Sequence, residues 1–126
     1  MRFMMMVRAN KNYEAGVQLT PDQNAAAAKL MDEMTKAGVL LDRGRLLPSS
    51  KGVRIRFNGD KRTVTNGPFA DPKELIAGFA FIEAKSMDEA VAWFSRLPYA
   101  DDREVEIRQM FEPGAAPAAD GPRPRA

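Results

Sequence analysis

Two helix-start motifs, set among stretches of alternating apolar residues, constrain most strongly what this sequence can fold into. Residues 20–23 (TPDQ) and residues 86–89 (SMDE) each combine a hydroxyl N-cap with Gln or Glu three positions later, which is the capping-box pattern. Pro21 also occupies the first helical position, where a missing N–H is tolerated. Gly38 and Pro98 are expected to end the two helices. The chain must therefore place two helices among its strands.

Period-two alternation predicts strands on both sides of each helix. In the first strand, Phe3, Met5 and Val7 share one face. Apolar Met4 and Met6 lie on the other face, so both faces are expected to be covered. Further strands are predicted over residues 39–47, interrupted by Gly44, over residues 53–57, over residues 76–83, and over residues 103–111 with Phe111 facing inward.

An Asn-Gly-Asp sequence after residues 53–57 predicts a hairpin with a half-buried strand. Looping at Asn-Gly would place Arg56 opposite Lys61, whereas looping at Gly-Asp pairs Ile55 with Val64. We favour the second register, because like charges directly opposite each other are destabilising and apolar pairs are stabilising.

The order of elements indicates an α+β sandwich of the ferredoxin-like type, in which two helices cover one face of an antiparallel sheet. The other face would carry Met4 and Met6, together with either the Phe79 and Phe81 set or its neighbours. This face has too much apolar surface to be left to water. We expect a second copy of the chain to cover it, forming a homodimer, because two-fold dimers are the commonest assembly.

The sequence predicts one domain over residues 1–112 and a Pro/Ala-rich tail over residues 113–126, which is expected to be flexible because it cannot bury a core. No apolar run approaches the ~18 residues that a membrane span needs. The apolar N-terminal stretch is closed by Arg8 and has no signal-peptide cleavage site. We therefore expect a cytoplasmic protein without a membrane partner.

The composition excludes several classes of function. The net charge is +2, and the tail accounts for +1 of it, so the body does not build the positive field of a nucleic-acid binder. The chain has no cysteine and no histidine, which excludes disulfides, thiolate nucleophiles, Ser-His-Asp triads and HExxH metal sites. Acid–base chemistry would depend on Asp, Glu, Lys or Tyr with a shifted pKa. The sequence predicts neither a metal nor a cofactor.

Three arginines form the best candidate for a ligand-binding site. Arg43 and Arg45 flank Gly44, and Arg8 ends the first strand, so three guanidiniums converge if these strand ends meet. Together they would hold a carboxylate or a phosphate through bidentate hydrogen bonds. The alternative is that they pair with acids such as Asp42, and the sequence leaves both possibilities open.

The turn at residues 66–69 (NGPF) is a second candidate, with Phe69 as one wall of a pocket. We favour the architectural interpretation, in which the Gly-Pro pair shapes the turn and Phe69 plugs the core. Residues 71–74 place carboxylates beside an ammonium, either as a site with tuned pKa values or as a solvated loop with weak surface ion pairs. For this cluster too, the solvated loop is favoured.

Residues 65–74 (TNGPFADPKE) resemble the signature of the YCII-related, DGPF-type proteins, although Asn66 stands where that motif begins with Asp. Matching segments lie at residues 38–41, 44–48, 78–79 and 86–90, so the resemblance covers about residues 1–112. It implies a dimeric α/β-barrel type of fold. It also places Lys73 and Glu74 among the candidate site residues, because both match the family's pattern just beyond the turn.

The resemblance implies little about activity. Some YCII-related proteins carry a His-Asp pair proposed as catalytic, and a chain without histidine cannot take over that role. The first hypothesis is a binding protein or enzyme that holds a small anionic molecule in a pocket between the sheet and a second copy. The alternative is a non-enzymatic regulatory or interaction module, since DGPF-type proteins are often encoded beside extracytoplasmic-function sigma factors. A pocket with convergent charges would favour the first, and a broad exposed apolar patch the second.

Overall fold

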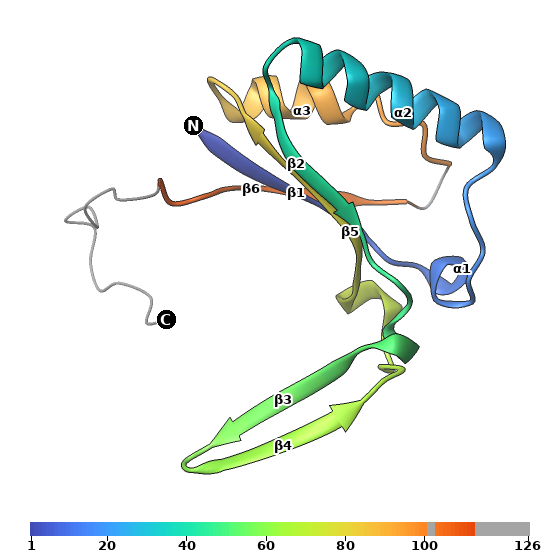
Figure 1. Ribbon diagram of the computed structural model, residues 1–126, viewed down its shortest axis with the longest axis vertical. Coiled ribbons are helices and arrows are strands. Elements are labelled where there is room, and N and C mark those ends of the chain that lie inside the picture. Colours follow the sequence, from blue (N-terminus) through green and yellow to red (C-terminus); the bar gives the residue numbers. More distant parts are fainter. Residues whose placement is uncertain (101–102, 113–126) are drawn as a thin grey trace.

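The computed structural model describes residues 1–100 and 103–112, so the tail predicted over residues 113–126 lies outside the described residues. Its main unit contains β1 (Arg2–Arg8), α2 (Pro21–Lys36), β2 (Leu40–Arg45), β5 (Ile76–Glu83), α3 (Met87–Phe94) and β6 (Val105–Gln109). The four strands form an open antiparallel sheet in the order β2-β5-β1-β6, and both helices cover the same face (Figure 1). This arrangement confirms the predicted α+β fold of the ferredoxin-like type.

The remaining elements lie at one end of this sheet. A short helix, α1 (Lys11–Glu14), follows β1. The chain between β2 and β5 forms a separate hairpin of β3 (Val53–Asn58) and β4 (Lys61–Asn66), flanked by the short 3₁₀ helices η1 (Ser49–Lys51) and η2 (Pro72–Glu74). Among the described residues, no helix has the length and apolar character needed to cross a membrane.

Both predicted helix starts are present. The Thr20 hydroxyl accepts a hydrogen bond from the Gln23 backbone N–H at 3.1 Å, and the Gln23 side chain accepts one from the Thr20 N–H at 3.0 Å, which completes the capping box. Ser86 caps α3 in the same way, accepting from the Glu89 N–H at 3.1 Å. The Glu89 carboxylate, however, accepts from the N–H of Lys85 rather than from that of Ser86.

The core lies between the sheet and the two helices. Phe3, Met34 and Ile82 are its largest fully buried side chains, and the odd-numbered apolar residues of β1 all face the helices, as predicted. The inward orientation predicted for Phe111 is wrong: this side chain is 79% exposed. The reason is that β6 ends at Gln109, so Phe111 lies beyond the last residue whose direction the sheet fixes.

Gly44 does not interrupt its strand, contrary to the sequence-based expectation. It lies inside β2 and pairs with Phe79 of β5. A Cβ atom built on Gly44 would lie 2.7 Å from the Phe79 ring, which is closer than two carbon atoms pack. Glycine is therefore needed here because an aromatic ring crosses the backbone.

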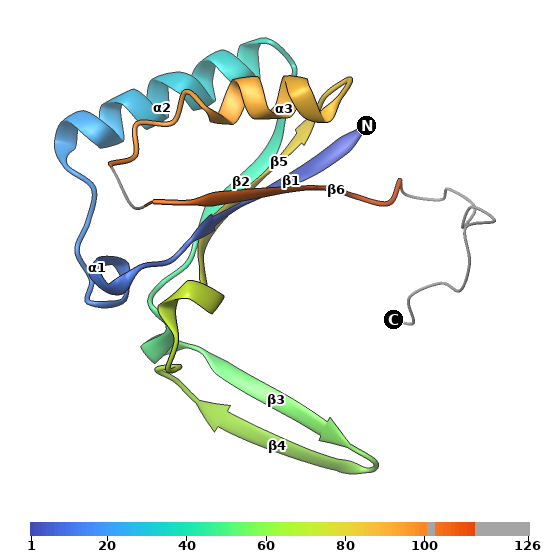
Figure 2. The same cartoon turned by 180° about the vertical axis from the view of Figure 1, so that it is seen from behind.

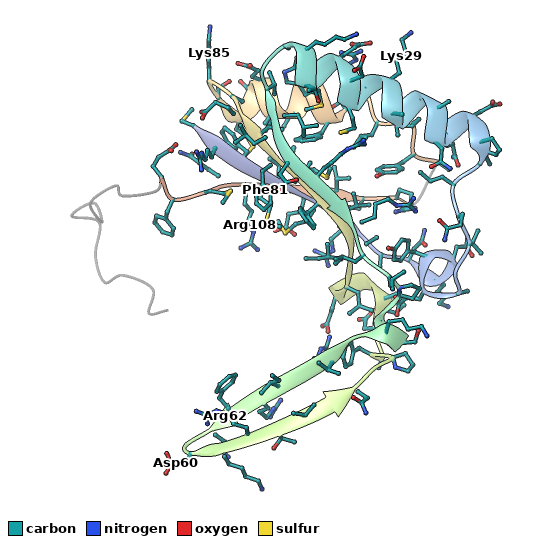
Figure 3. The ribbon with its side chains drawn as sticks, viewed as in Figure 1. Lys29, Asp60, Arg62, Phe81, Lys85 and Arg108 are labelled. Carbon is teal, nitrogen blue, oxygen red and sulfur yellow. The ribbon has the colours of Figure 1, made fainter. Side chains whose placement is uncertain are left out.

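The sheet face away from the helices is apolar at its centre. Half-buried Met4 and Met6 on β1 lie opposite Phe81 and Phe79 on β5, and the two aromatic rings are 5.4 Å apart. Figure 3 shows Phe81 and Arg108 on this side of the sheet, away from α2 and α3. We call this surface the open face. Nothing in the described chain packs over it as the helices do on the other side (Figure 2).

The hairpin has the favoured register, with Ile55 opposite Val64 and Arg56 opposite Thr63. The expectation that it is half-buried is wrong, because all six residues of β3 and all six of β4 are exposed. The hairpin leaves the end of the main sheet and extends below it, on the side away from the helices (Figures 1 and 2). The alternation of apolar and charged residues along β3 therefore predicted a strand correctly, but it did not predict whether another part of the chain packs against that strand.

Replacing Thr20 with alanine tests the cap of α2. Thr20→Ala leaves the Gln23 N–H without its partner, and we expect the free energy of unfolding to fall by about 1 kcal/mol, since a lost cap costs ~0.5–2 kcal/mol. Chemical denaturation followed by circular dichroism measures this. Thr65→Ala makes the same chemical change on the exposed hairpin and should stay within about 0.5 kcal/mol of the wild type. Equal losses in both variants would contradict the role assigned to Thr20.

Candidate functional site

A cleft of about 560 Å³ lies between the N-terminal half of α2 and the helix-covered face of the sheet. Its walls come from α1 and the loop after it, from α2, β2 and β5, and from the segment before β6. The apolar and aromatic lining residues are Met5, Val7, Tyr13, Val17, Leu19, Ala27, Ala28, Met31, Ala77, Phe79, Ala80, Leu97, Tyr99 and Ala100. The polar and charged ones are Asn10, Asn12, Gln18, Gln23, Asn24, Arg43, Arg45 and Arg103, and Gly44 and Gly78 complete the lining.

The cleft exists because alanines in the first half of α2 leave space above the sheet. Gln23, Asn24, Ala27 and Ala28 line it, and none of them is buried. Further along the helix, the longer side chain of Met31 is buried. An alanine methyl group ends close to the helix axis, so it leaves space above the strands that a larger side chain would fill.

Two of the predicted arginines meet in this cleft. Arg43 and Arg45 pair with Ala80 and Gly78 of β5 and share the helix-covered face with them. The Arg45 guanidinium donates a hydrogen bond to the Gln18 side-chain oxygen at 3.1 Å. The structure therefore brings Arg43 and Arg45 to one wall, as the alternation along β2 requires.

Arg8 does not join them. It lies on the open face and forms an ion pair with Glu106 at 3.0 Å, an acid that Arg108 also contacts. The side-chain hydrogen bond from Arg108, the nearby charge of Arg108 and the hydrogen bond from Arg8 together lower the pKa of the Glu106 carboxyl. Successive residues of a strand point to opposite faces, and Arg8 follows Val7, which faces the helices. Of the two possibilities that the sequence left open, Arg43 and Arg45 thus follow the first and share the cleft, while Arg8 follows the second and pairs with an acid.

Arg103 supplies the third guanidinium, and sequence reasoning did not single it out. It lies just before β6, stacks over the Tyr99 ring at 4.9 Å from its centroid, and lines the cleft. Its Nε atom is shielded from solvent and has no hydrogen-bond partner among the described residues. The local sequence gives no sign that Arg103 belongs to the site. Arg103 enters the cleft because β2 and β6 form the two edges of the sheet, and this order depends on strand pairing between distant segments.

Two tyrosines complete the polar wall. The Tyr13 hydroxyl donates to the Ala77 backbone oxygen at 2.9 Å. Burial raises the pKa of Tyr99 and of Tyr13, and the charges of Arg45 and Arg103 oppose this only in part. Both phenols therefore stay protonated at neutral pH and act as hydrogen-bonding groups rather than as bases.

The turn at residues 66–69 lies at the base of the hairpin and not in the cleft. A Cβ atom on Gly67 would lie 1.8 Å from the Ser49 carbonyl oxygen, so only glycine fits there. The Ser49 hydroxyl accepts from the Phe69 N–H at 3.0 Å and itself donates to the Glu14 carboxylate. Arg54 stacks 3.9 Å above the Phe69 ring. These contacts favour the architectural interpretation of the turn and tie it to α1, although Phe69 packs under Arg54 at the base of the hairpin rather than in the core.

The acidic and basic cluster beyond the turn is also separate from the cleft. Glu74 is exposed on η2 and does not line the cleft, while the side chain of Lys73 lies outside what the structure describes. Within the described ranges, no three Asp, Glu, His or Cys side chains come together in a way that could hold a metal ion. The pocket was expected between the sheet and a second copy, but the cleft formed by one chain lies on the opposite face of the sheet.

Comparison with known proteins places this architecture in a family. The sequence model of the YCII-related domain matches residues 1–113, which span all three described α-helices and all six described strands. The uncharacterized protein R00369 of Rhizobium meliloti (strain 1021) is 32% identical over 87 residues, covering 66% of this chain and 70% of that protein. A match over the whole ferredoxin-like unit identifies the chain as a member of the YCII-related domain family.

Proposed function

We propose that this protein binds a small anionic molecule, a carboxylate or a phosphate ester, in the cleft between α2 and the sheet. One observation carries the proposal: three guanidiniums line the cleft, and none of the described lining residues is Asp or Glu. None of Arg43, Arg45 and Arg103 forms an ion pair with a described carboxylate. Positive charge that has no acidic partner among the described residues, beside an apolar and partly enclosed surface, attracts an anion more strongly than it would in bulk water.

The chemistry of the walls indicates the kind of anion. A guanidinium presents a planar fork of donors that matches two oxygens of a carboxylate or phosphate. The floor beneath the arginines is apolar, from Met5, Val7 and Ala77. A cleft of about 560 Å³ has the size of a small-molecule site. The ligand class that fits is therefore a compact molecule with one anionic group and an apolar or aromatic body.

The cleft favours binding over proton transfer. Besides the arginines, the ionisable side chains among the described lining residues are Tyr13 and Tyr99, and burial raises the pKa of both. Neither an arginine nor a protonated phenol accepts a proton readily at neutral pH. The alternative function, a regulatory or interaction module, would need an exposed surface for a partner. The exposed hairpin offers such a surface, and it is separate from the cleft.

Arg45→Ala tests the proposal by thermal unfolding in the presence of two probes, benzoate and inorganic phosphate. At a probe concentration ten times Kd, binding stabilises the folded state by about 1.4 kcal/mol, a rise of several degrees in Tm. We expect at least one probe to stabilise the wild type and Arg45→Ala to abolish that shift, with the Tm without probe unchanged. Arg45 is exposed, so its loss should not disturb the core.

Arg56→Ala is the matched control, because it removes the same charge from the hairpin, outside the cleft. It should keep the full probe-dependent shift. Arg45→Lys should keep part of it, since an ammonium retains the charge but not the bidentate fork. The proposal fails if neither probe stabilises the wild type, or if Arg45→Ala responds like the wild type.

The affinity for benzoate, which is fully ionised throughout, should not depend on pH between about pH 6 and pH 9, because guanidiniums stay charged and raised pKa values keep both tyrosines protonated there. Isothermal titration calorimetry with benzoate across this range measures the affinity directly. A fall in affinity toward the alkaline end would point to a titrating cation such as lysine and would contradict the assignment to Arg43, Arg45 and Arg103.

A further inference from the structure

The loop between α1 and α2 closes one end of the cleft. It is the blue segment that runs from α1 to the start of α2 in Figure 1, and Val17, Gln18 and Leu19 line the cleft from it. The Val17 N–H donates to the Asn12 carbonyl oxygen at 2.9 Å, and Thr20 is the N-cap of α2. Contacts on both sides thus hold Gln18 at the wall of the cleft.

The Gln18 side-chain amide contacts one of the cleft arginines. Its oxygen accepts a hydrogen bond from Arg45 Nη2 at 3.1 Å, and its nitrogen donates to the Gly16 carbonyl oxygen at 3.4 Å. Within the part of the chain that the structure describes, this amide is the only hydrogen-bond partner of the Arg45 guanidinium. Both side chains are exposed, so rotation of Gln18 breaks the contact without disturbing the core.

A primary amide has nearly the shape of a carboxylate. Both groups are planar and place two heteroatoms at equivalent positions, but a carboxylate offers two acceptor oxygens and a full negative charge. Only the oxygen end of an amide can face a guanidinium, because a guanidinium has donors and no acceptor. A carboxylate can instead accept two parallel hydrogen bonds from it, which adds both energy and geometric specificity. A phosphate is tetrahedral, so a planar amide does not reproduce its shape.

We propose that Gln18 is an internal occupant of a carboxylate subsite on Arg45, and that the ligand of the cleft is a carboxylate whose head group displaces the Gln18 amide. This inference rests on the anion binding proposed above, and it narrows the ligand class from carboxylates and phosphate esters to carboxylates. The amide keeps Arg45 oriented while the cleft is empty. It also competes with the ligand, since only molecules in which this contact is broken can bind.

Two neighbouring side chains fit a carboxylate that carries an apolar body. Arg43 lies two positions before Arg45 on the same face of β2, and it has no ion-pair partner among the described residues. It therefore adds positive charge beside the subsite. Val17, next to Gln18, lines the cleft and is 56% exposed. An apolar body attached to the carboxylate would cover Val17, and burial of apolar surface is favourable.

Isothermal titration calorimetry with benzoate and phenyl phosphate, at about pH 7, tests the ligand class on the full chain. The two probes share a phenyl body, and phenyl phosphate carries the larger negative charge at this pH. We nevertheless expect the affinity for benzoate to be higher by roughly threefold or more, because its planar head group matches the amide that it replaces. Equal or tighter binding of phenyl phosphate would overturn the carboxylate assignment and leave the proposed anion binding intact. Binding of neither probe would overturn both.

Two substitutions of Gln18 should change the affinity for benzoate in opposite directions. Gln18→Ala removes the internal competitor, and we expect the affinity to rise by about two- to threefold. Gln18→Glu is isosteric and places a carboxylate of the chain itself on Arg45. It should lower the affinity by roughly tenfold or more, because a tethered group acts at a high effective concentration. Unchanged or reduced affinity in Gln18→Ala would mean that Gln18 does not compete with the ligand, which overturns the proposal.

Asn12→Asp is the matched control. It makes the same change of amide to carboxylate in the lining of the cleft, but within the described chain the Asn12 side chain has no hydrogen bond to Arg45. Its charge should weaken benzoate binding by less than about threefold, since exposed charges that are not in contact interact weakly. Circular dichroism and the Tm without probe confirm that every variant is folded. A Gln18→Glu variant that binds benzoate no more weakly than Asn12→Asp contradicts the placement of the subsite on Arg45.

Discussion

Burial of β1 between two strands and beneath two helices is the interaction on which the other elements depend. β1 is hydrogen-bonded on one edge to β5 and on the other to β6, so its register sets theirs. Met5, at its centre, lies between Ala80 and Ile107 and is buried under the helices. Because both edges and one face of this strand are occupied, a slip of one residue would turn its buried side chains to the wrong face.

The cleft follows from the same packing. β2 joins the sheet through β5, which fixes Arg43 and Arg45 on the helix-covered face. The helix above them carries alanines in its first half, so the arginines border an open space instead of being covered. A charged side chain beside apolar surface is normally compensated by an acid. Here no described lining residue provides one, and the proposal that the cleft binds an anion rests on this imbalance.

A small cluster of contacts connects the cleft to the hairpin. Tyr13 and Glu14 are neighbours on α1: the first lines the cleft, and the second accepts hydrogen bonds from both the N–H and the hydroxyl of Ser49. The Ser49 hydroxyl also accepts a hydrogen bond from the Phe69 N–H, which fixes the turn before η2. The turn that carries the family resemblance therefore acts as the joint at which the hairpin leaves the sheet, and its glycine is required by the approach of the Ser49 carbonyl.

The sequence by itself determined the main strands, the two longer helices with their hydroxyl N-caps, the hairpin register and the fold class. These depend on local hydrogen bonds and on the period of apolar residues, both of which can be read along one segment. It also placed Arg43 and Arg45 on one face. Only the tertiary structure decided that Arg8 faces away from them, because that depends on which face of β1 the helices cover.

The same holds for the residues that the sequence missed or misplaced. Arg103 enters the cleft because β6 pairs with β1, a contact between residues about a hundred positions apart. Alternation in β3 predicts a strand with one apolar face, but it carries no information about what packs against that face. The sequence therefore determines which side chains share a surface, while only the assembled sheet determines which surfaces meet, since burial depends on contacts between distant segments.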